Sequence, residues 1–180
     1  MLSARREKCM KVIRDTGLDG VLFALSPNFE YLTESHSCFY QRNCFVIDAE
    51  IAGASVMPEA LVYVNKEGKS TILTIPKHRD TVNTLLNEVV VSYYDQFEDE
   101  LTRIVDGKNI GIGRYCDKWI TEALKKVDPE ITVTMVEELF IDIRRIKDEK
   151  EIEHMAHLAK FTDDAVMYVC KHLKPGMTMW

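Results

Sequence analysis

Short apolar runs that stop at turn-forming residues constrain the fold of this chain more than any other feature. Val21–Leu25 ends at a Ser-Pro-Asn turn and indicates a strand that is buried on both faces. Leu61–Val64 and Ser70–Ile75 flank a polar loop whose Gly68 suits a left-handed residue, so these two runs predict an antiparallel hairpin. All of these runs are far shorter than the ~20 residues of a membrane helix. The pattern therefore predicts a sheet and no membrane span.

Strand and helix patterns alternate in the rest of the first 146 residues. Further strands are predicted at Cys44–Ile47, Val89–Val91, Ile110–Gly113 and Ile131–Val136. Helices are predicted at Asp80–Glu88, Phe97–Val105, Trp119–Val127 and Glu137–Ile146. A hairpin followed by strand–helix units predicts an α/β fold in which a mixed β-sheet is flanked by helices on both faces.

Two more helices are predicted before the hairpin. Leu2–Gly17 carries an approximately helical apolar stripe among charged residues and is closed by its glycine. Ser26 is placed to cap a short helix that has Pro27 at its first position and continues through Leu32. Because the first segment is charged throughout and has no apolar core of a secretory signal, we expect it to be retained and the protein to be cytoplasmic.

One long helix is predicted from Asp148 to Leu173. Asp148 occupies the N-cap position and acidic residues follow in the first turn, near the positive end of the helix dipole. The pattern spans about 26 residues, which at ~1.5 Å each make a rod of nearly 39 Å. A rod of this length, attached after a completed sheet, needs a second surface to pack on. We therefore expect a first domain at residues 1–146 and the opening of a truncated second domain at residues 147–180.

The charge balance argues against nucleic acid as a partner. The 180 residues contain 23 Lys and Arg against 29 Asp and Glu, which gives a formal net charge of −6 at pH 7. Such a chain has no basic field to collect phosphate groups. The five cysteines are scattered, without a C-x-x-C pair, which argues against a disulfide framework and against a zinc knuckle. We expect reduced thiols.

Three local patterns resemble known site motifs but lack parts that those motifs need. Glu151 and His154 are spaced to bind one metal ion, yet no second E-x-x-H exists, so a solvated charged face is the preferred interpretation. The Gly-Ile-Gly that ends at Gly113 lacks the third glycine of a dinucleotide loop. His36 and Cys38 offer an imidazole beside a thiol, which leaves a thiol enzyme as a minor alternative.

The stretch from Tyr31 to Arg42 is the most informative candidate contact site. It contains Tyr31, His36, Phe39, Tyr40 and Arg42. Aromatic rings and an arginine on a loop offer large rigid surfaces and a bidentate clamp for carboxylates, which ligand and protein contact sites use. Packing of Phe39 and Tyr40 in the core is an equal alternative at this point.

Three stretches together resemble one family. Ser26–Thr33 is similar to the segment that follows the first strand in the amino-terminal domain of creatinase, prolidase and aminopeptidase P. Ile143–Ile152 resembles the junction at which that domain passes into the long helix of the pita-bread catalytic domain. Leu173–Thr178 is similar to the end of that helix. The resemblance implies the family's mixed sheet with a ribonuclease H-like motif, followed by one long helix.

The same resemblance implies a hydrolase of the metallopeptidase type. Its substrates are peptides with proline in the second position or small amidino compounds, and two divalent metal ions (Mn, Co or Zn) are held in the pita-bread domain. The resemblance places this chain before those ligands. We therefore expect no cofactor, metal ligand or catalytic residue in the chain and no activity of its own. The family's amino-terminal domain is a lid and dimerisation unit, so the complete protein is expected to be a homodimer.

The resemblance also implies three substrate contacts made in trans, in the neighbouring subunit's active site. They are Arg42, Tyr31 and Phe39, and the arginine is expected to help hold a carboxylate. Glu34 stands where the family usually has glycine, which is a departure from the motif. The alternative to a peptidase domain is a stand-alone module that binds a ligand or protein through the same loop and has no hydrolase activity.

Overall fold

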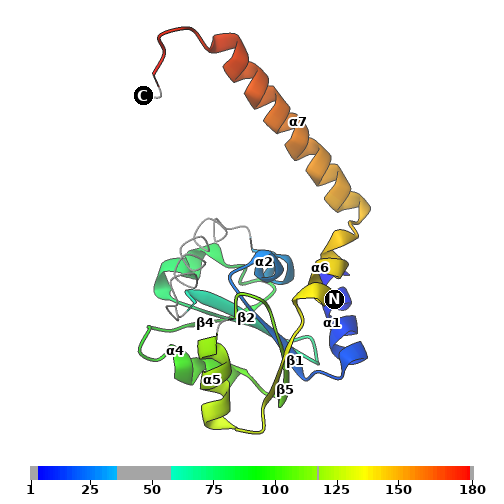
Figure 1. Cartoon of the computed structure of the whole chain (residues 1–180), viewed down its shortest axis with the longest axis vertical. Coiled ribbons are helices and arrows are strands. Elements are labelled where there is room, and N and C mark those ends of the chain that lie inside the picture. The colour runs from blue at the N-terminus through cyan, green and yellow to red at the C-terminus, as the bar shows by residue number, and fades with distance from the viewer. Residues whose placement is uncertain (1–3, 36–57, 117, 179–180) are drawn as a thin grey trace. The chain divides into compact units, whose positions relative to one another are not determined.

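The computed structural model describes residues 4–35, 58–116 and 118–178. The chain divides into two compact units, Met1–Ile143 and Arg144–Trp180 (Figure 1). The strand predicted at Cys44–Ile47 lies outside the described residues. Among the helices that are described, none is both long enough and apolar enough to cross a membrane.

The first unit is built on one mixed sheet whose described strands lie in the order β4-β3-β2-β1-β5-β6. The strands are β1 (Gly20–Ala24), β2 (Ala60–Asn65), β3 (Ser70–Thr74), β4 (Glu88–Val91), β5 (Asn109–Ile112) and β6 (Thr132–Met135). The pairs β1–β2 and β2–β3 are antiparallel, whereas β1–β5, β5–β6 and β3–β4 are parallel. The sheet is mixed, as the hairpin and the strand–helix units predict.

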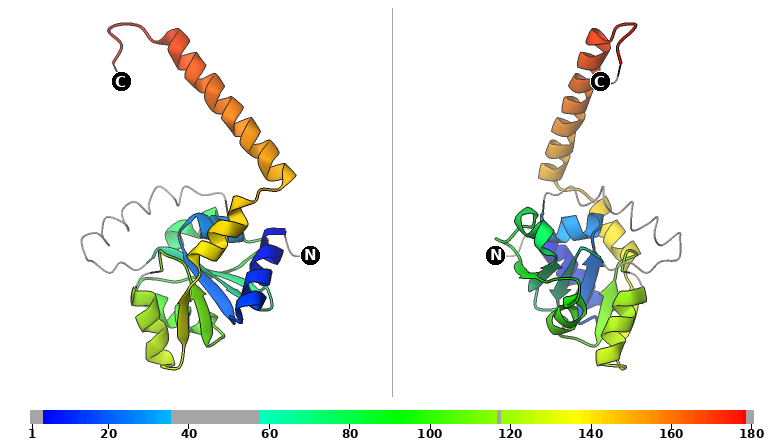
Figure 2. Two further views of the ribbon diagram at one scale, coloured as in Figure 1. Left: turned by 45° about the vertical axis from the view of Figure 1, so that its right-hand side comes forward. Right: turned by 90° about the vertical axis from the view of Figure 1, so that its left-hand side faces the viewer.

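Helices cover both faces of this sheet (Figure 2). The helical elements are α1 (Ala4–Thr16), α2 (Pro27–Thr33), the 3₁₀ helix η2 (Pro76–Thr81), α4 (Phe97–Ile104), α5 (Lys118–Val127), α6 (Glu137–Arg145) and α7 (Glu149–His172). One core packs α1, α2 and the start of α6 against Val21 and Phe23 of β1. The other packs α4 and α5 against Leu22 and Ala24 of the same strand. Because successive residues of a strand face opposite sides, β1 supplies both cores.

Local signals predict the ends of the first helices and the hairpin well. Gly17 follows α1 with φ +67°, and Gly68 turns the β2–β3 hairpin with φ +85°. Ser26 caps α2, since its Oγ accepts a hydrogen bond from the Phe29 N–H at 3.2 Å, and Pro27 is the first helical residue. These positions confirm the predictions made from turn and cap chemistry.

The helix predicted at Asp80–Glu88 is wrong. The 3₁₀ helix η2 ends at Thr81, turns follow, and Glu88 already belongs to β4. Asn83 Oδ1 accepts a hydrogen bond from the Leu85 N–H at 3.1 Å, and Asn87 Nδ2 donates to the Asn83 carbonyl at 2.7 Å. Asparagine side chains that bond nearby backbone in this way compete with helical hydrogen bonds, so the apolar periodicity does not decide the structure here.

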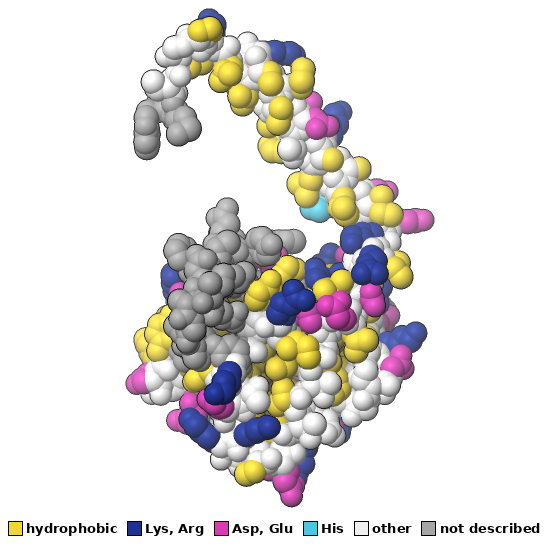
Figure 3. Space-filling view, viewed as in Figure 1, with side chains coloured by type: hydrophobic (Ala, Val, Ile, Leu, Met, Phe, Trp, Pro, Cys, Tyr) yellow, Lys and Arg dark blue, Asp and Glu magenta, His cyan; other side chains and the backbone are white. Residues whose placement is uncertain are grey.

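The second unit contains α7. A capping box begins the helix: Asp148 Oδ1 accepts from the Glu151 N–H at 2.9 Å, and Glu151 Oε2 accepts from the Asp148 N–H at 3.1 Å. The predicted N-cap is therefore confirmed, and the helix ends at His172 beside the predicted Leu173. Hydrophobic side chains follow α7 along its length (Figure 3). The division between the units falls after Ile143, inside α6, and the domain boundary at residues 146/147 stays a prediction.

Candidate functional site

The Tyr-Leu-Thr stretch that carries the family resemblance forms the last turn of α2. Leu32 and Thr33 are completely buried, and the Thr33 hydroxyl donates to the Phe29 carbonyl at 2.9 Å. Glu34 ends the helix in the left-handed conformation, with φ 52° and ψ 30°, and its N–H donates to the Glu30 carbonyl at 2.9 Å. A glutamate thus adopts the conformation that glycine enters at lower cost.

Tyr31 is the one predicted substrate contact that the structure describes. Its side chain is 8% exposed, and the Arg5 guanidinium lies 4.9 Å from the centre of its ring. This distance is typical of a cation–π contact, which connects α1 to α2. Phe39 and Arg42 lie outside the described residues, as do His36 and Cys38 of the thiol-enzyme alternative.

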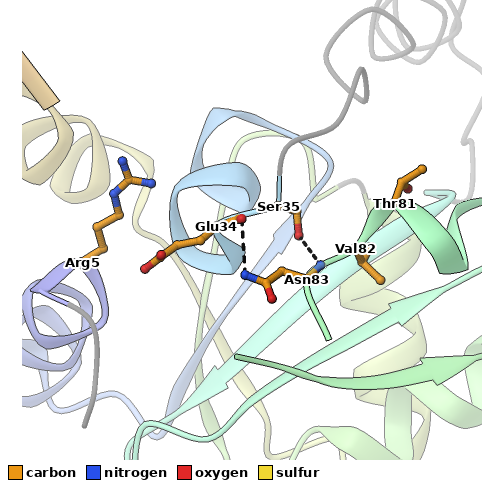
Figure 4. A pocket seen from close by; sticks show the side chains of 6 residues that line it. All are labelled: Arg5, Glu34, Ser35, Thr81, Val82 and Asn83. Atoms are coloured by element: carbon orange, nitrogen blue, oxygen red, sulfur yellow. Dashed lines mark hydrogen bonds between the residues drawn. The ribbon is translucent and has the colours of Figure 1, made fainter. Parts of the chain in front are cut away.

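A polar pocket of about 490 Å³ lies where α2 ends (Figure 4). It is lined by Arg5, Glu34, Ser35, Thr81, Val82 and Asn83. The Asn83 N–H donates to Ser35 Oγ at 3.0 Å, and Asn83 Nδ2 donates to the Glu34 carbonyl at 3.5 Å. These two bonds join the end of α2 to the turns after η2 and fix one wall of the pocket.

The described lining of the pocket suits a polar ligand. Its walls offer a guanidinium, a carboxylate, two hydroxyl groups and an amide. None of the six lining residues forms a nucleophile paired with a base. Asn83 was not predicted as a site residue, because its partner Ser35 lies 48 residues earlier in the chain and no local pattern connects them.

A buried arginine, Arg6, connects α1 to α2 and to the turn of the β2–β3 hairpin through hydrogen bonds. Arg6 is 5% exposed. Its guanidinium donates to the carbonyls of Leu32 at 3.1 Å and Gly68 at 3.3 Å, and to Asn87 Oδ1 at 3.1 Å. Asn87 Nδ2 in turn donates to the Thr33 carbonyl at 3.0 Å. Burial lowers the pKa of Arg6 from its ordinary value, although the nearby Cys9 and Glu34 act in the opposite direction.

The described buried thiols are not arranged as nucleophiles. Burial raises the pKa of Cys9 to about 12, so its reactive thiolate form is suppressed at neutral pH. Cys116 is buried as well, where its Sγ donates to the Leu22 carbonyl at 3.2 Å. Both residues act as packing groups within the first unit.

The resemblance assigns the two-metal centre to a later domain, and the residues described by the structure offer no comparable ligand group. Among them, no three His, Cys, Asp or Glu side chains lie close enough together to hold a metal ion. Glu151 and His154 share α7, but no further ligand joins them within the described part of the chain. We therefore derive no metal-dependent step from these residues.

Comparison with known proteins finds relatives of similar sequence and fold. No family model matches the chain. Over 177 residues it is 25% identical to the Xaa-Pro dipeptidase of Pyrococcus horikoshii. The aligned region covers 98% of this chain and 44% of that protein. The crystal structure of the prolidase from P. horikoshii OT3 matches with a TM-score of 0.66 at 19% identity, over 97% of this chain and 44% of that one.

The chain is also similar to a peptidase amino-terminal domain whose structure was solved by itself. The N-terminal domain of the cytoplasmic peptidase PepQ from Mycobacterium tuberculosis H37Rv matches with a TM-score of 0.52 at 17% identity, over 78% of this chain and 98% of that one. The chain has the fold of the amino-terminal domain of Xaa-Pro peptidases. This confirms the resemblance to the prolidase and aminopeptidase P family and the α/β fold that it implies. The chain spans less than half, 44%, of the length of the P. horikoshii dipeptidase.

Proposed function

We propose that this chain is the non-catalytic amino-terminal domain, with the connecting helix, of a metal-dependent Xaa-Pro peptidase or a related hydrolase, and that it acts as lid and dimerisation unit. One observation carries the proposal. The chain matches 98% of an isolated peptidase N-terminal domain but only 44% of a complete prolidase. These coverages support assigning the chain to the amino-terminal, supporting part of such a peptidase.

The metals, substrate and location follow from the same proposal. Two divalent ions, Mn, Co or Zn, are bound by the catalytic domain of the complete enzyme, where they activate water and polarise the scissile carbonyl. The substrate is a small peptide with proline in the second position, or an amidino compound. The enzyme is a cytoplasmic homodimer. The name of the M. tuberculosis relative, a cytoplasmic peptidase, supports the location.

The 180-residue chain is expected to show no peptidase activity. Incubation with Mn²⁺ or Co²⁺ and Gly-Pro or Ala-Pro should release no proline, because the proposal assigns the metal ligands to the catalytic domain and the described residues form no cluster of three candidate ligands. A complete prolidase assayed in parallel controls for the metal and substrate conditions. Robust hydrolysis that co-purifies with the chain would contradict the proposal.

Arg42 remains the leading proposed substrate contact, with Tyr31 and Phe39 beside it. In an enzyme that contains this chain together with a catalytic domain, Arg42→Ala should raise KM or lower kcat by about tenfold or more, since a charged hydrogen bond to a carboxylate is lost. Arg14→Ala, on the exposed face of α1, is the matched control. Unchanged KM and kcat in Arg42→Ala would remove this residue from the site.

A second candidate function is a ligand-binding module without hydrolase activity. The pocket lined by Arg5, Glu34 and Asn83 favours it, because opposite charges and an amide converge there. The reading frame discriminates between the two candidates. Continuation beyond Trp180 into a further Asp, Asp, His, Glu, Glu set supports the peptidase, and a stop codon supports the module.

A further inference from the structure

A second polar pocket lies on the face of the sheet that α4 and α5 cover, opposite to the face that packs on α1 and α2. Its volume is about 390 Å³, and it lies over β2, β3 and β4 beside the last turn of α4. All of its lining residues belong to the described part of the first unit, and none of them lines the pocket at the end of α2. The two pockets are therefore separate sites.

Three neighbouring strands supply the floor of this pocket. Tyr63 of β2 pairs with Thr71 of β3, and Thr71 pairs with Glu88 of β4. Residues that pair across a sheet point to the same face, so these three side chains lie side by side. Asn65 and Val90 stand two positions further along β2 and β4 and share that face. The floor therefore combines polar groups with one apolar side chain.

Asp106, which follows α4, is held beside this floor by two neutral donors. The Tyr63 hydroxyl donates to one carboxylate oxygen at 2.7 Å, and Asn65 Nδ2 donates to the other at 2.9 Å. Burial and the bond to Asp106 raise the pKa of Tyr63, so its hydroxyl remains a donor at neutral pH. A carboxylate has about four acceptor positions. Asp106 therefore keeps lone pairs for a further donor.

The other charged groups of the lining already form pairs. Lys69 Nζ lies 2.7 Å from the Glu88 carboxylate, and the Arg103 guanidinium lies 3.1 Å from the Glu100 carboxylate. The described hydrogen-bond partners of Asp106, in contrast, carry no charge. The lining thus contains one more carboxylate than cations. This excess of negative charge favours a cationic ligand.

The arrangement of the carboxylates suits an extended organic cation better than a metal ion. Within the described residues, no three His, Cys, Asp or Glu side chains lie close enough together to hold a metal ion. Glu88, Glu100 and Asp106 therefore line the pocket without meeting at one point. Positive groups that are joined by a hydrocarbon chain can reach such carboxylates separately. Val90 and Ile104 offer apolar contact for the chain.

We propose that this pocket binds a short aliphatic diamine, with one ammonium group on Asp106 and the other on Glu100. Glu100 is a better second partner than Glu88, because its side chain is 18% exposed against 53% and solvent screens it less. The Arg103 side chain is 74% exposed and can turn into solvent when the ammonium group arrives. The proposal goes beyond the peptidase role and gives the first unit a ligand site of its own.

Isothermal titration of the 180-residue chain with the diamine putrescine at low ionic strength tests the proposal. We expect saturable binding in the millimolar range that weakens as salt is added, because salt screens charge pairs near the surface. γ-Aminobutyrate, a molecule of similar length with a carboxylate in place of one ammonium group, should bind at least about tenfold more weakly. Equal binding of the two molecules, or no binding of putrescine, would overturn the proposal.

Variants separate this pocket from a general effect of negative charge. Asp106→Asn should raise the dissociation constant for putrescine at least about tenfold, because the amide carries no charge. Asp99→Asn makes the same change of charge at an exposed position of α4 outside the pocket lining, and it is the matched control. It should leave the affinity unchanged. Equal effects of the two variants would contradict a site at Asp106.

Amide NMR of the wild-type chain gives a second measurement that does not depend on how a variant folds. Addition of putrescine should shift the resonances of Asn65, Thr71 and Asp106, and these shifts should give one common dissociation constant. Shifts confined to residues outside the pocket would overturn the proposal. Neither measurement bears on the absence of peptidase activity, so this proposal and the proposed function fail separately.

Discussion

Replacing Arg6 by Met is expected to lower the free energy of unfolding by about 3 to 5 kcal/mol, because buried acceptors lose their donor. The carbonyls of Leu32 and Gly68 receive hydrogen bonds from this guanidinium in the structure. Asn87 Oδ1 loses one of its two donors and keeps the Ser70 hydroxyl at 2.6 Å. Methionine fills much of the volume but donates nothing, so most of the loss comes from unsatisfied polar groups.

Urea unfolding followed by circular dichroism measures this loss. Arg14→Met is the matched control, since Arg14 lies on the exposed face of the same helix, and it should change stability by less than about 0.5 kcal/mol. Arg6→Lys should give an intermediate loss, because a single ammonium does not reproduce the planar fork of donors. If Arg6→Met is as stable as Arg14→Met, the network does not hold α1, α2 and the hairpin together.

Phe140→Ala is expected to cost about 3 to 5 kcal/mol, the range for removing a buried phenylalanine. Phe140 is fully buried, and its ring centre lies 4.6 Å from that of Phe23 across the contact between α6 and the sheet. A cavity left at this contact adds its own cost to the transfer free energy of the lost ring.

Thermal unfolding of Phe140→Ala and of Leu139→Ala gives the comparison. Leu139 precedes Phe140 on α6 and is 40% exposed, so its truncation should cost less than about 1 kcal/mol. A double-mutant cycle with Phe23→Ala should show a coupling of about 0.5 to 1.5 kcal/mol between the two rings. Equal losses for Phe140→Ala and Leu139→Ala would mean that α6 is not anchored by this aromatic pair.

Features encoded by a few neighbouring residues were predictable from the sequence. Ser26 and Pro27 predict the start of α2, and Gly68 predicts the turn of the hairpin, because the conformation that each needs is decided within one turn of chain. The same holds for Asp148 and Glu151, whose reciprocal bonds begin α7. The candidate site was predictable only in part. The position of Tyr31 follows from its motif, whereas its burial beneath Arg5 does not.

The sequence by itself thus determined most of the described element types, most helix ends and the mixed character of the sheet, but not the turns after Thr81. Only the tertiary structure decided the strand order, with β1 between antiparallel β2 and parallel β5. It also decided that Arg6 is a buried donor to Gly68 and that the turns after Thr81 form a pocket wall instead of a helix. The physical reason is separation along the chain. Arg6 and Gly68 are 62 residues apart, and a hydrogen bond between such distant groups leaves no periodicity or cap signal in the local sequence.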